Sequence, residues 1–206
     1  MSERPAGNHD LSGTEARQVA KVVPTLNVAN LLTLSRLVLV PVFVLALFAA
    51  DGHDLWWRAV ATALFAIASL TDQVDGWVAR RYGLITDFGK IADPIADKAL
   101  TGAALVGLSL LDELAWWVTI TIAAREIAVT LLRFWVLRHG VIPASRGGKI
   151  KTVLQTVALG LAIMPLPAVL DPGVAVLMLA AVVVTVLTGI DYLVRALRLR
   201  SRARAG

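Results

Sequence analysis

The sequence predicts an all-α integral membrane protein with six transmembrane helices and a short N-terminal juxtamembrane helix. Of its 206 residues, 57% are hydrophobic, and the mean hydropathy of +0.72 disfavours a soluble globular domain. Several apolar stretches approach or exceed the roughly 20 residues that a helix needs to cross a bilayer. Lys and Arg also gather in alternate connections, as expected of a protein that crosses the membrane several times.

One membrane domain with two polar ends is expected. Residues 1–25 are polar, contain Pro and Gly and have weak periodicity, which predicts a disordered cytosolic tail. Residues 26–197 form the membrane domain, and residues 198–206 form a basic C-terminal tail suited to anionic lipid. No cleavable signal peptide is expected, because no apolar core precedes Val28. The chain contains no cysteine, which excludes disulfides and thiolate metal sites.

The first span is expected at residues 31–50. Residues 27–32 precede it and are expected to lie along the membrane surface as the juxtamembrane helix. Asn30, Thr33 and Arg36 recur every three residues and make a polar strip at the cytosolic end of the span. Two interpretations of this strip stay open: an Arg36 that snorkels to the membrane surface, or a strip that faces substrate.

The second span, residues 55–70, begins with a tryptophan pair typical of an interfacial aromatic belt. Its helix is expected to continue through an acidic segment to a loop near residues 82–89. We expect the next helix to begin around Pro94, because a proline in the first turn of a helix loses no intrahelical hydrogen bond. The third span, residues 99–111, is short alone but adequate with the turns before it.

The remaining spans are expected at residues 115–137, 152–169 and 173–190, and a second tryptophan pair opens the first of them. A basic loop at 138–151 contains the pair Gly147–Gly148, whose exposed backbone amides beside cations would receive a phosphate. Contact of this loop with anionic lipid is the alternative interpretation.

The distribution of Lys and Arg predicts the orientation. The N-terminal tail, the acidic segment, the basic loop and the C-terminus all fall on one side, whereas the opposite turns contain no Lys or Arg. Arg58 alone lies just inside the second span on that opposite side. The positive-inside rule therefore places both termini and the acidic segment in the cytosol.

Four aspartates flank the loop at 82–89. Asp72 and Asp75 share one helical face before it, and Asp93 and Asp97, an i, i+4 pair, share a face after it. Carboxylates brought to one cleft repel one another unless cations lie between them. Oxygen ligands without a nearby Cys or His favour a hard ion such as Mg²⁺ or Mn²⁺, often completed by substrate phosphates. Solvated loop acids are the alternative, which the apolar flanks disfavour.

This spacing resembles the complete signature of the CDP-alcohol phosphotransferases, Asp72-x2-Asp75-Gly76-x2-Ala79-Arg80-x8-Gly89-x3-Asp93-x3-Asp97. Members of that family are integral membrane enzymes that transfer a CDP-linked group to an alcohol and release CMP. The resemblance implies a site for two Mg²⁺ or Mn²⁺ ions with the ligands Asp72, Asp75, Asp93 and Asp97. It implies that Asp97 is also the general base. It implies a nucleotide site lined by Asn30, Thr33, Gly76, Ala79, Arg80 and Gly89.

Charges within the fourth span suggest a second site. Arg125 lies near mid-span, where a lipid-facing charge would cost several kcal/mol, so we expect it to face protein or a wet cavity. Arg125, Val129 and Arg133 share a helical face. A structural ion pair between Arg125 and Glu126 is the alternative, although sequence neighbours point about 100° apart on a helix.

Further segments, one of them overlapping the end of the signature, resemble the bacterial phosphatidylglycerophosphate synthases within this family: Asn30–Arg36, Asp93–Lys98, Arg125–Glu126, Arg133 and Gly148–Thr152. The resemblance implies CDP-diacylglycerol as donor, sn-glycerol 3-phosphate as acceptor, a homodimer and the bacterial inner membrane. A dianionic acceptor needs several cations, and our candidates are Arg125, Arg133, Arg146, Lys149 and Lys151. Phosphatidylglycerol, the acceptor of cardiolipin synthase, and inositol phosphate stay open as alternatives.

A transporter or channel is the alternative outside this class of enzyme, because charges inside a membrane domain occur there too. A transporter more often has repeated halves or helices broken at mid-membrane. The chain has no convincing internal repeat, and its acids are expected at one membrane edge. We therefore favour an enzyme, with the lipid bilayer and no nucleic acid among its partners.

Overall fold

A computed structural model describes residues 28–82, 87–136 and 146–205 of the chain. This part of the chain consists of helices joined by turns, with no strand, which confirms the all-α prediction. Its elements in order are α1 (Val28–Phe48), η1 (Ala49–Gly52), α2 (Leu55–Tyr82), α3 (Asp87–Leu110), α4 (Trp116–Val136), α5 (Arg146–Ile163), η2 (Ala168–Leu170) and α6 (Asp171–Ala205).

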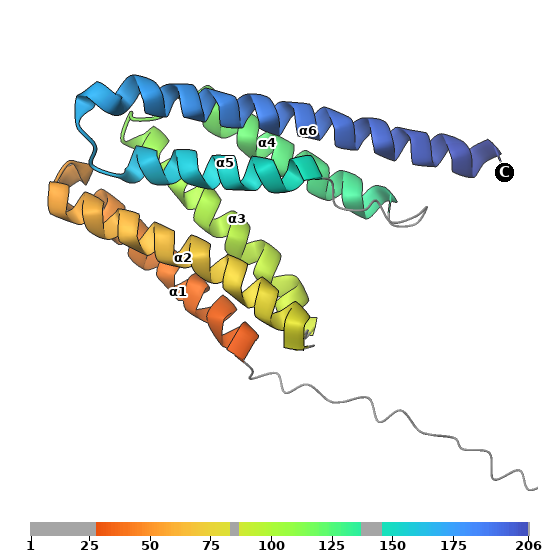
Figure 1. Cartoon of the computed structure of the whole chain (residues 1–206), viewed down its shortest axis with the longest axis horizontal. Helices are drawn as coiled ribbons and strands as arrows, with labels where there is room; N and C mark the ends of the chain where they lie inside the picture. The colour runs from red at the N-terminus through yellow and green to blue at the C-terminus, as the bar shows by residue number, and fades with distance from the viewer. Residues whose placement is uncertain (1–27, 83–86, 137–145, 206) are drawn as a thin grey trace, which may run out of the picture.

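The six α-helices form two groups of three (Figure 1). Helix α1 packs along α2 and α3, whereas α6 packs along α4 and α5, and contacts from α5 to α2 and α3 join the groups. The turns at 49–54, 111–115 and 164–170 meet at one end of the bundle, which we call the far end. Toward the opposite end, where α2 ends and α3 begins, the two groups diverge. We call this the motif end.

Small residues allow close contact between the helices of the bundle. The rings of Phe43 in α1 and Phe65 in α2 pack with centroids 5.8 Å apart. At Gly107 in α3, a Cβ atom would lie 2.5 Å from the Leu47 side chain, so glycine lets α1 and α3 approach. Buried alanines recur on most helices of this core: Ala46, Ala61, Ala68, Ala104, Ala158 and Ala181. Such small residues are typical of helix packing in membranes, where van der Waals contact drives association.

The outward faces of all six helices carry large apolar side chains that protein does not cover. Leu45 in α1 and Leu187 in α6 are examples. Soluble proteins rarely expose contiguous apolar surface on this scale. Residues 31–52 and 168–198 are long and apolar enough to cross a membrane, and most of each stretch is not buried within the protein. The chain is therefore a membrane protein.

The first two predicted spans correspond to α1 and α2. Residues 28–32 begin α1 and continue it without a break, so the separate juxtamembrane helix expected there is wrong for these residues. Residues 1–25, predicted to be a tail, lie outside the described part of the chain. The prediction that the second helix continues through the acidic segment is confirmed, since α2 runs 28 residues to Tyr82.

The start of α3 differs from the prediction. It begins at Asp87, so Pro94 lies inside the helix rather than in its first turn. A proline removes one backbone donor, and membrane helices tolerate this where neighbouring groups satisfy the freed carbonyl. The next helix, α4, matches its predicted span to within one residue at each end.

The expected basic loop is shorter than its sequence indicates. Helix α5 begins at Arg146, so the pair Gly147–Gly148 lies in its first turn and not in a loop. It ends at Ile163, before the two prolines that were expected within the span. Helix α6 continues the predicted sixth span through the basic segment to Ala205.

Candidate active site

The fold brings both halves of the signature to the motif end. Asp75, Gly76, Ala79 and Arg80 follow Asp72 on α2, and the three remaining residues, Gly89, Asp93 and Asp97, lie on the first part of α3. Asp72 is the signature aspartate whose side chain the structure describes; those of the other three lie outside the described residues, and so does the side chain of Arg80. Their convergence on one cleft stays a prediction.

Asp72 forms an ion pair with Arg36 on the neighbouring helix. Arg36 Nη1 lies 2.5 Å from Asp72 Oδ1, and the two side chains are 0% and 37% exposed. Thr33, one turn earlier on α1, is also buried. The interpretation of Arg36 as a snorkelling residue is therefore wrong, since its guanidinium points into the protein toward the signature. The side chain of Asn30, the third member of the strip, lies outside the described residues.

This geometry fits a divalent cation at Asp72. More than a third of the side chain is exposed although one oxygen pairs with Arg36, and a carboxylate oxygen is a ligand that Mg²⁺ or Mn²⁺ prefers. Among the described side chains, no group of three or more His, Cys, Asp or Glu is placed to hold a metal ion. Three of the four predicted ligands fall outside those side chains.

A cavity of about 210 Å³ lies between α3, α4 and α5, and Lys98, the residue after Asp97, is part of its wall. Its polar lining consists of Lys98, Thr101, Glu126, Lys151, Thr152, Gln155 and Thr156. Two lysines and one glutamate give these groups a net charge of +1. The cavity therefore suits an anion that carries hydrogen-bond acceptors.

Glu126 connects the cations around this cavity. Its Oε1 atom accepts a hydrogen bond from the buried Lys151 ammonium and lies 3.0 Å from Arg125 Nη1. The Lys98 ammonium donates to Thr130 Oγ1, which itself donates to the Glu126 backbone carbonyl over 2.7 Å. The Oε1 atom of Gln155 is buried and has no hydrogen-bond partner within the described part of the chain. A ligand with a donor group would satisfy this oxygen.

Arg125 faces α6 rather than the cavity. Its Nε atom donates to the Thr185 carbonyl over 3.2 Å, and Nη2 donates to Thr188 Oγ1 over 3.1 Å. A Cβ atom on Gly189 would lie 3.1 Å from Arg125 Cγ, so glycine makes room for this side chain. The geometric argument against an ion pair between Arg125 and Glu126 was wrong. Both side chains are long enough to meet although their Cβ atoms diverge.

The other predicted acceptor residues are distributed around the start of α5. Lys151 is buried and lines the cavity, whereas Lys149, two positions earlier and so about 200° away on the helix, is exposed and does not. The side chains of Arg133 and Arg146 lie outside the described residues. The acceptor roles of all five residues stay predictions.

Sequence reasoning missed most polar residues of this cavity as site residues, Lys98 and Gln155 among them. Lys98 directly follows the last signature aspartate, and Gln155 follows Lys151 by four residues, on the same helical face. The signal that could have identified Gln155 is its polar amide in an otherwise apolar span. Its place in a cavity depends on which face of α5 meets α3, and periodicity along one helix does not report this.

Comparison with known proteins agrees with the signature. The sequence matches the CDP-alcohol phosphatidyltransferase family model over residues 26–187. It is 55% identical over 184 residues to a Mycobacterium tuberculosis H37Rv protein named probable phosphatidylglycerophosphate synthase, covering 89% of this chain and 88% of that protein. It is 37% identical over 182 residues to the Bacillus subtilis protein named CDP-diacylglycerol–glycerol-3-phosphate 3-phosphatidyltransferase, covering 81% and 93% of the two chains. The chain belongs to the CDP-alcohol phosphatidyltransferase family.

Proposed function

We propose that the protein transfers the phosphatidyl group of CDP-diacylglycerol to sn-glycerol 3-phosphate, giving phosphatidylglycerophosphate and CMP. The observation that carries this proposal is the complete signature at the motif end beside a cavity with two lysines. The printed name of the Bacillus subtilis relative states the same donor and acceptor. The match to the Mycobacterium tuberculosis protein covers about nine-tenths of both chains, which supports assigning the same activity to this chain.

The donor site is assigned to the two signature helices. Two Mg²⁺ or Mn²⁺ ions would be held by Asp72, Asp75, Asp93 and Asp97. When bound, such ions neutralise phosphate charge and favour departure of a nucleotide. The nucleotide would contact Asn30, Thr33, Gly76, Ala79, Arg80 and Gly89. The ion pair between the buried Arg36 and the partly exposed Asp72 supports this assignment, because it orients the first signature carboxylate and leaves part of it accessible.

The acceptor site is assigned to the cavity between α3, α4 and α5. In this proposal the acceptor phosphate pairs with Lys151 and Lys98, and Arg133 and Arg146 stay candidates for further contacts. Arg125 faces α6 and Lys149 is exposed outside the cavity, so neither is assigned a direct contact with the phosphate there. Lys98 directly follows Asp97 on α3, and we propose that the acceptor hydroxyl reaches the Asp97 carboxylate from this cavity. Gln155 Oε1 is available to accept a hydrogen bond from a hydroxyl group of the glycerol.

The reaction follows from this placement. Asp97 takes the proton of the acceptor 1-hydroxyl, whose oxygen then attacks the phosphorus that carries the diacylglycerol group. The bond from that phosphorus to the CMP oxygen breaks, and CMP leaves with the electron pair, with its charge stabilised near Arg80. Positioning and fixed charges supply most of the rate enhancement, as in phosphoryl transfer generally.

All six helices cross the bacterial cell membrane in this proposal, with both termini and the motif end in the cytosol. The far-end turns contain no Lys or Arg, and both tryptophan pairs lie exposed there, as expected at an extracytosolic interface. Helix α6 is about 50 Å long, which exceeds the roughly 30 Å of hydrocarbon, so its arginine-rich end reaches the cytosol. A homodimer is the assembly that the family resemblance implies.

Release of CMP from CDP-diacylglycerol by the purified protein tests the proposed function. Glycerol 3-phosphate, inositol phosphate and phosphatidylglycerol would be offered as separate acceptors. We expect CMP with glycerol 3-phosphate and at most a small fraction of that rate with the other two. Preference for phosphatidylglycerol or inositol phosphate would replace the acceptor and keep the family chemistry. No CMP with any acceptor would leave a transporter as the better explanation of the charged groups.

A further inference from the structure

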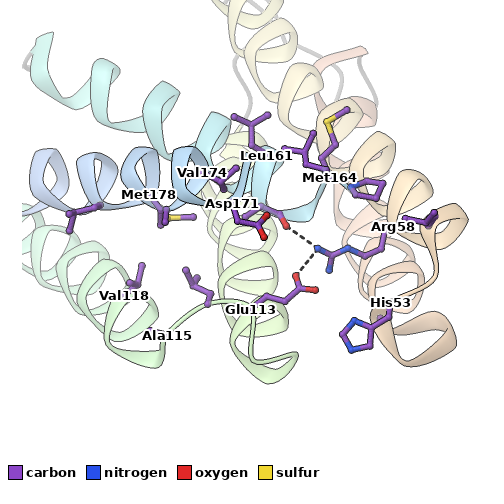
Figure 2. A pocket seen from close by; sticks show the side chains of 18 of the residues that line it. His53, Arg58, Glu113, Ala115, Val118, Leu161, Met164, Asp171, Val174 and Met178 are labelled. Atoms are coloured by element: carbon purple, nitrogen blue, oxygen red, sulfur yellow. Dashed lines mark hydrogen bonds and ion pairs between the residues drawn. The ribbon is translucent and has the colours of Figure 1, made fainter. Parts of the chain in front are cut away.

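A second cavity of about 610 Å³ lies at the far end, between α2, α5, α6 and the turn that begins α4 (Figure 2). Its volume is in the range of small-molecule sites, roughly 300–1,000 Å³. Arg58 in this cavity and Asp75 of the signature are about 25 Å apart along α2, from the helical rise of 1.5 Å per residue. This cavity is therefore separate from the proposed transferase site.

Arg58 supplies the cation of this cavity. Its side chain is only 8% exposed, and Nη2 lies 2.6 Å from Glu113 Oε2 and donates to the Ala162 carbonyl over 2.9 Å. Nη1 is buried, yet it finds no hydrogen-bond partner among the residues that the structure describes. Figure 2 shows the guanidinium turned into the cavity, on the side of Glu113 and His53. A buried donor of a charged group is costly to leave unsatisfied, so this nitrogen indicates a missing acceptor.

The walls away from Arg58 are apolar. Leu161 and Met164 come from α5 and its end, Val174 and Met178 from α6, and Trp117 from α4. One side of the cavity thus offers charged groups and the other offers hydrocarbon. A ligand that matches both sides is an amphiphile, with a polar headgroup at Arg58 and an acyl chain along α6.

The charges at the polar side select the headgroup. Arg58 is the one Lys or Arg that lines the cavity within the described residues, and Glu113 and Asp171 add two carboxylates. With neutral His53 these groups sum to −1, which disfavours a simple anion. A headgroup with both a phosphate and a primary ammonium fits this arrangement. Its phosphate accepts from Arg58 Nη1, and its ammonium donates to Glu113 and Asp171.

We propose that the far-end cavity binds a zwitterionic phospholipid whose headgroup carries a phosphate and a primary ammonium, as in phosphatidylethanolamine. A quaternary ammonium, as in phosphatidylcholine, has no N–H group to donate to the two carboxylates. Phosphatidylglycerol adds a further negative charge to the cavity and has no ammonium group to donate to the two carboxylates. This binding needs no turnover, so it is independent of the proposed transferase reaction.

Thermal unfolding of the purified full chain in detergent tests the proposal, with native mass spectrometry to count bound lipid. The added ligands are phosphatidylethanolamine, phosphatidylcholine, phosphatidylglycerol and free phosphoethanolamine. We expect one tightly bound phosphatidylethanolamine and a rise in Tm of about 5 °C near saturation. The other three should shift Tm by about 1 °C or less. Equal shifts with all three lipids, or no shift with any, would overturn the proposal. An equal shift with free phosphoethanolamine would overturn the assignment to a lipid.

Two variants and one control locate the site. Arg58→Gln should weaken phosphatidylethanolamine binding at least tenfold. Because this change also breaks the contact with Glu113, Ala175→Trp provides a second route, since Ala175 lines the cavity and a tryptophan there would fill it. Arg195→Gln is the control, because it removes an exposed arginine outside the cavity. This variant should bind the lipid as the wild type does. Undiminished binding by Ala175→Trp would place the lipid elsewhere and overturn the proposal.

Discussion

Arg36 Nη1 lies 2.5 Å from Asp72 Oδ1, which joins a fully buried cation on α1 to the first signature carboxylate on α2. Arg36→Ala removes this cation, so Asp72 loses its ion pair with α1. We expect Arg36→Ala to lower the free energy of unfolding by about 1.5–3 kcal/mol, the usual loss of a hydrogen bond to a charged group, because the remaining Asp72 carboxylate is partly solvated. Denaturation in detergent measures this loss.

Arg195→Ala is the matched control for this change. The Arg195–Asp191 pair is also formed by an arginine and an aspartate, but its side chains are 51% and 48% exposed. Exposed pairs contribute roughly 0–1 kcal/mol, so this variant should unfold almost as the wild type does. Equal losses for the two variants would show that the Arg36 pair has no special role in stability.

Asp97→Asn tests the proposed base. An amide cannot take the proton of the acceptor hydroxyl, and loss of general-base catalysis typically costs about 10²–10⁴ in rate. We expect CMP release to fall by at least that factor while the thermal unfolding curve is retained. Asp191→Asn removes an exposed carboxylate from α6 and should leave turnover unchanged. Near-normal turnover of Asp97→Asn would remove this residue from the base role.

Chelation tests the proposed metal requirement. Dialysis against EDTA should abolish nearly all CMP release, because the proposed mechanism needs divalent ions at the signature aspartates. Addition of Mg²⁺ or Mn²⁺ should restore it. Circular dichroism before and after dialysis checks that the helices persist. Full activity after exhaustive chelation would contradict the metal assignment.

The variants Lys151→Gln and Lys149→Gln compare a lysine that lines the acceptor cavity with one on the exposed surface of α5. Lys151 lines the cavity, and Glu126 keeps its contact with Arg125 when Lys151 is lost. We expect Lys151→Gln to raise KM for sn-glycerol 3-phosphate about tenfold or more, with little change in KM for CDP-diacylglycerol. The exposed Lys149 should give a smaller change. If Lys151→Gln changed only the KM for CDP-diacylglycerol, the acceptor site would lie elsewhere.

Gly52→Ala tests the turn that joins α1 to α2. Gly52 has φ of +76°, and a Cβ atom there would lie 2.5 Å from Leu111 Cδ2. Strain and overpacking together should cost about 2–4 kcal/mol of unfolding free energy, measured by denaturation. Gly173→Ala is the control, since a Cβ atom there meets nothing within 4 Å. Similar stabilities of the two variants would contradict the close packing of this turn.

The parts of the fold that the sequence predicts well are those with local signals. Helix α4 was placed to within a residue because a tight turn precedes it and an apolar run with few charges defines its length. Pro94 and Gly147–Gly148 misled the prediction, because each is typical of a helix boundary or loop in isolation. The surrounding bundle keeps both within helices, where tertiary contacts override the local preference.

The candidate site also has a part that local sequence signals predict and a part that depends on tertiary contacts. The signature identified the family because it is a fixed spacing within one segment of the chain. The partners of Arg36, Arg125 and Lys151 depend on which helices pack together, and periodicity within a helix does not report its neighbours. Both cavities are lined by side chains from three or more helices, so no single stretch of residues indicated them.

The division of the bundle into two groups of three has a consequence for the acceptor cavity. Lys98 belongs to the first group and Lys151 to the second, so the two ammonium groups approach a common anion only at one separation of the groups. Each lysine lies about 18 Å along its helix from the far-end turns, from the helical rise of 1.5 Å per residue. A tilt of a few degrees at those turns therefore displaces each lysine by about 1 Å, enough to lengthen a hydrogen bond, which couples the recognition of the small acceptor to the packing of the entire molecule.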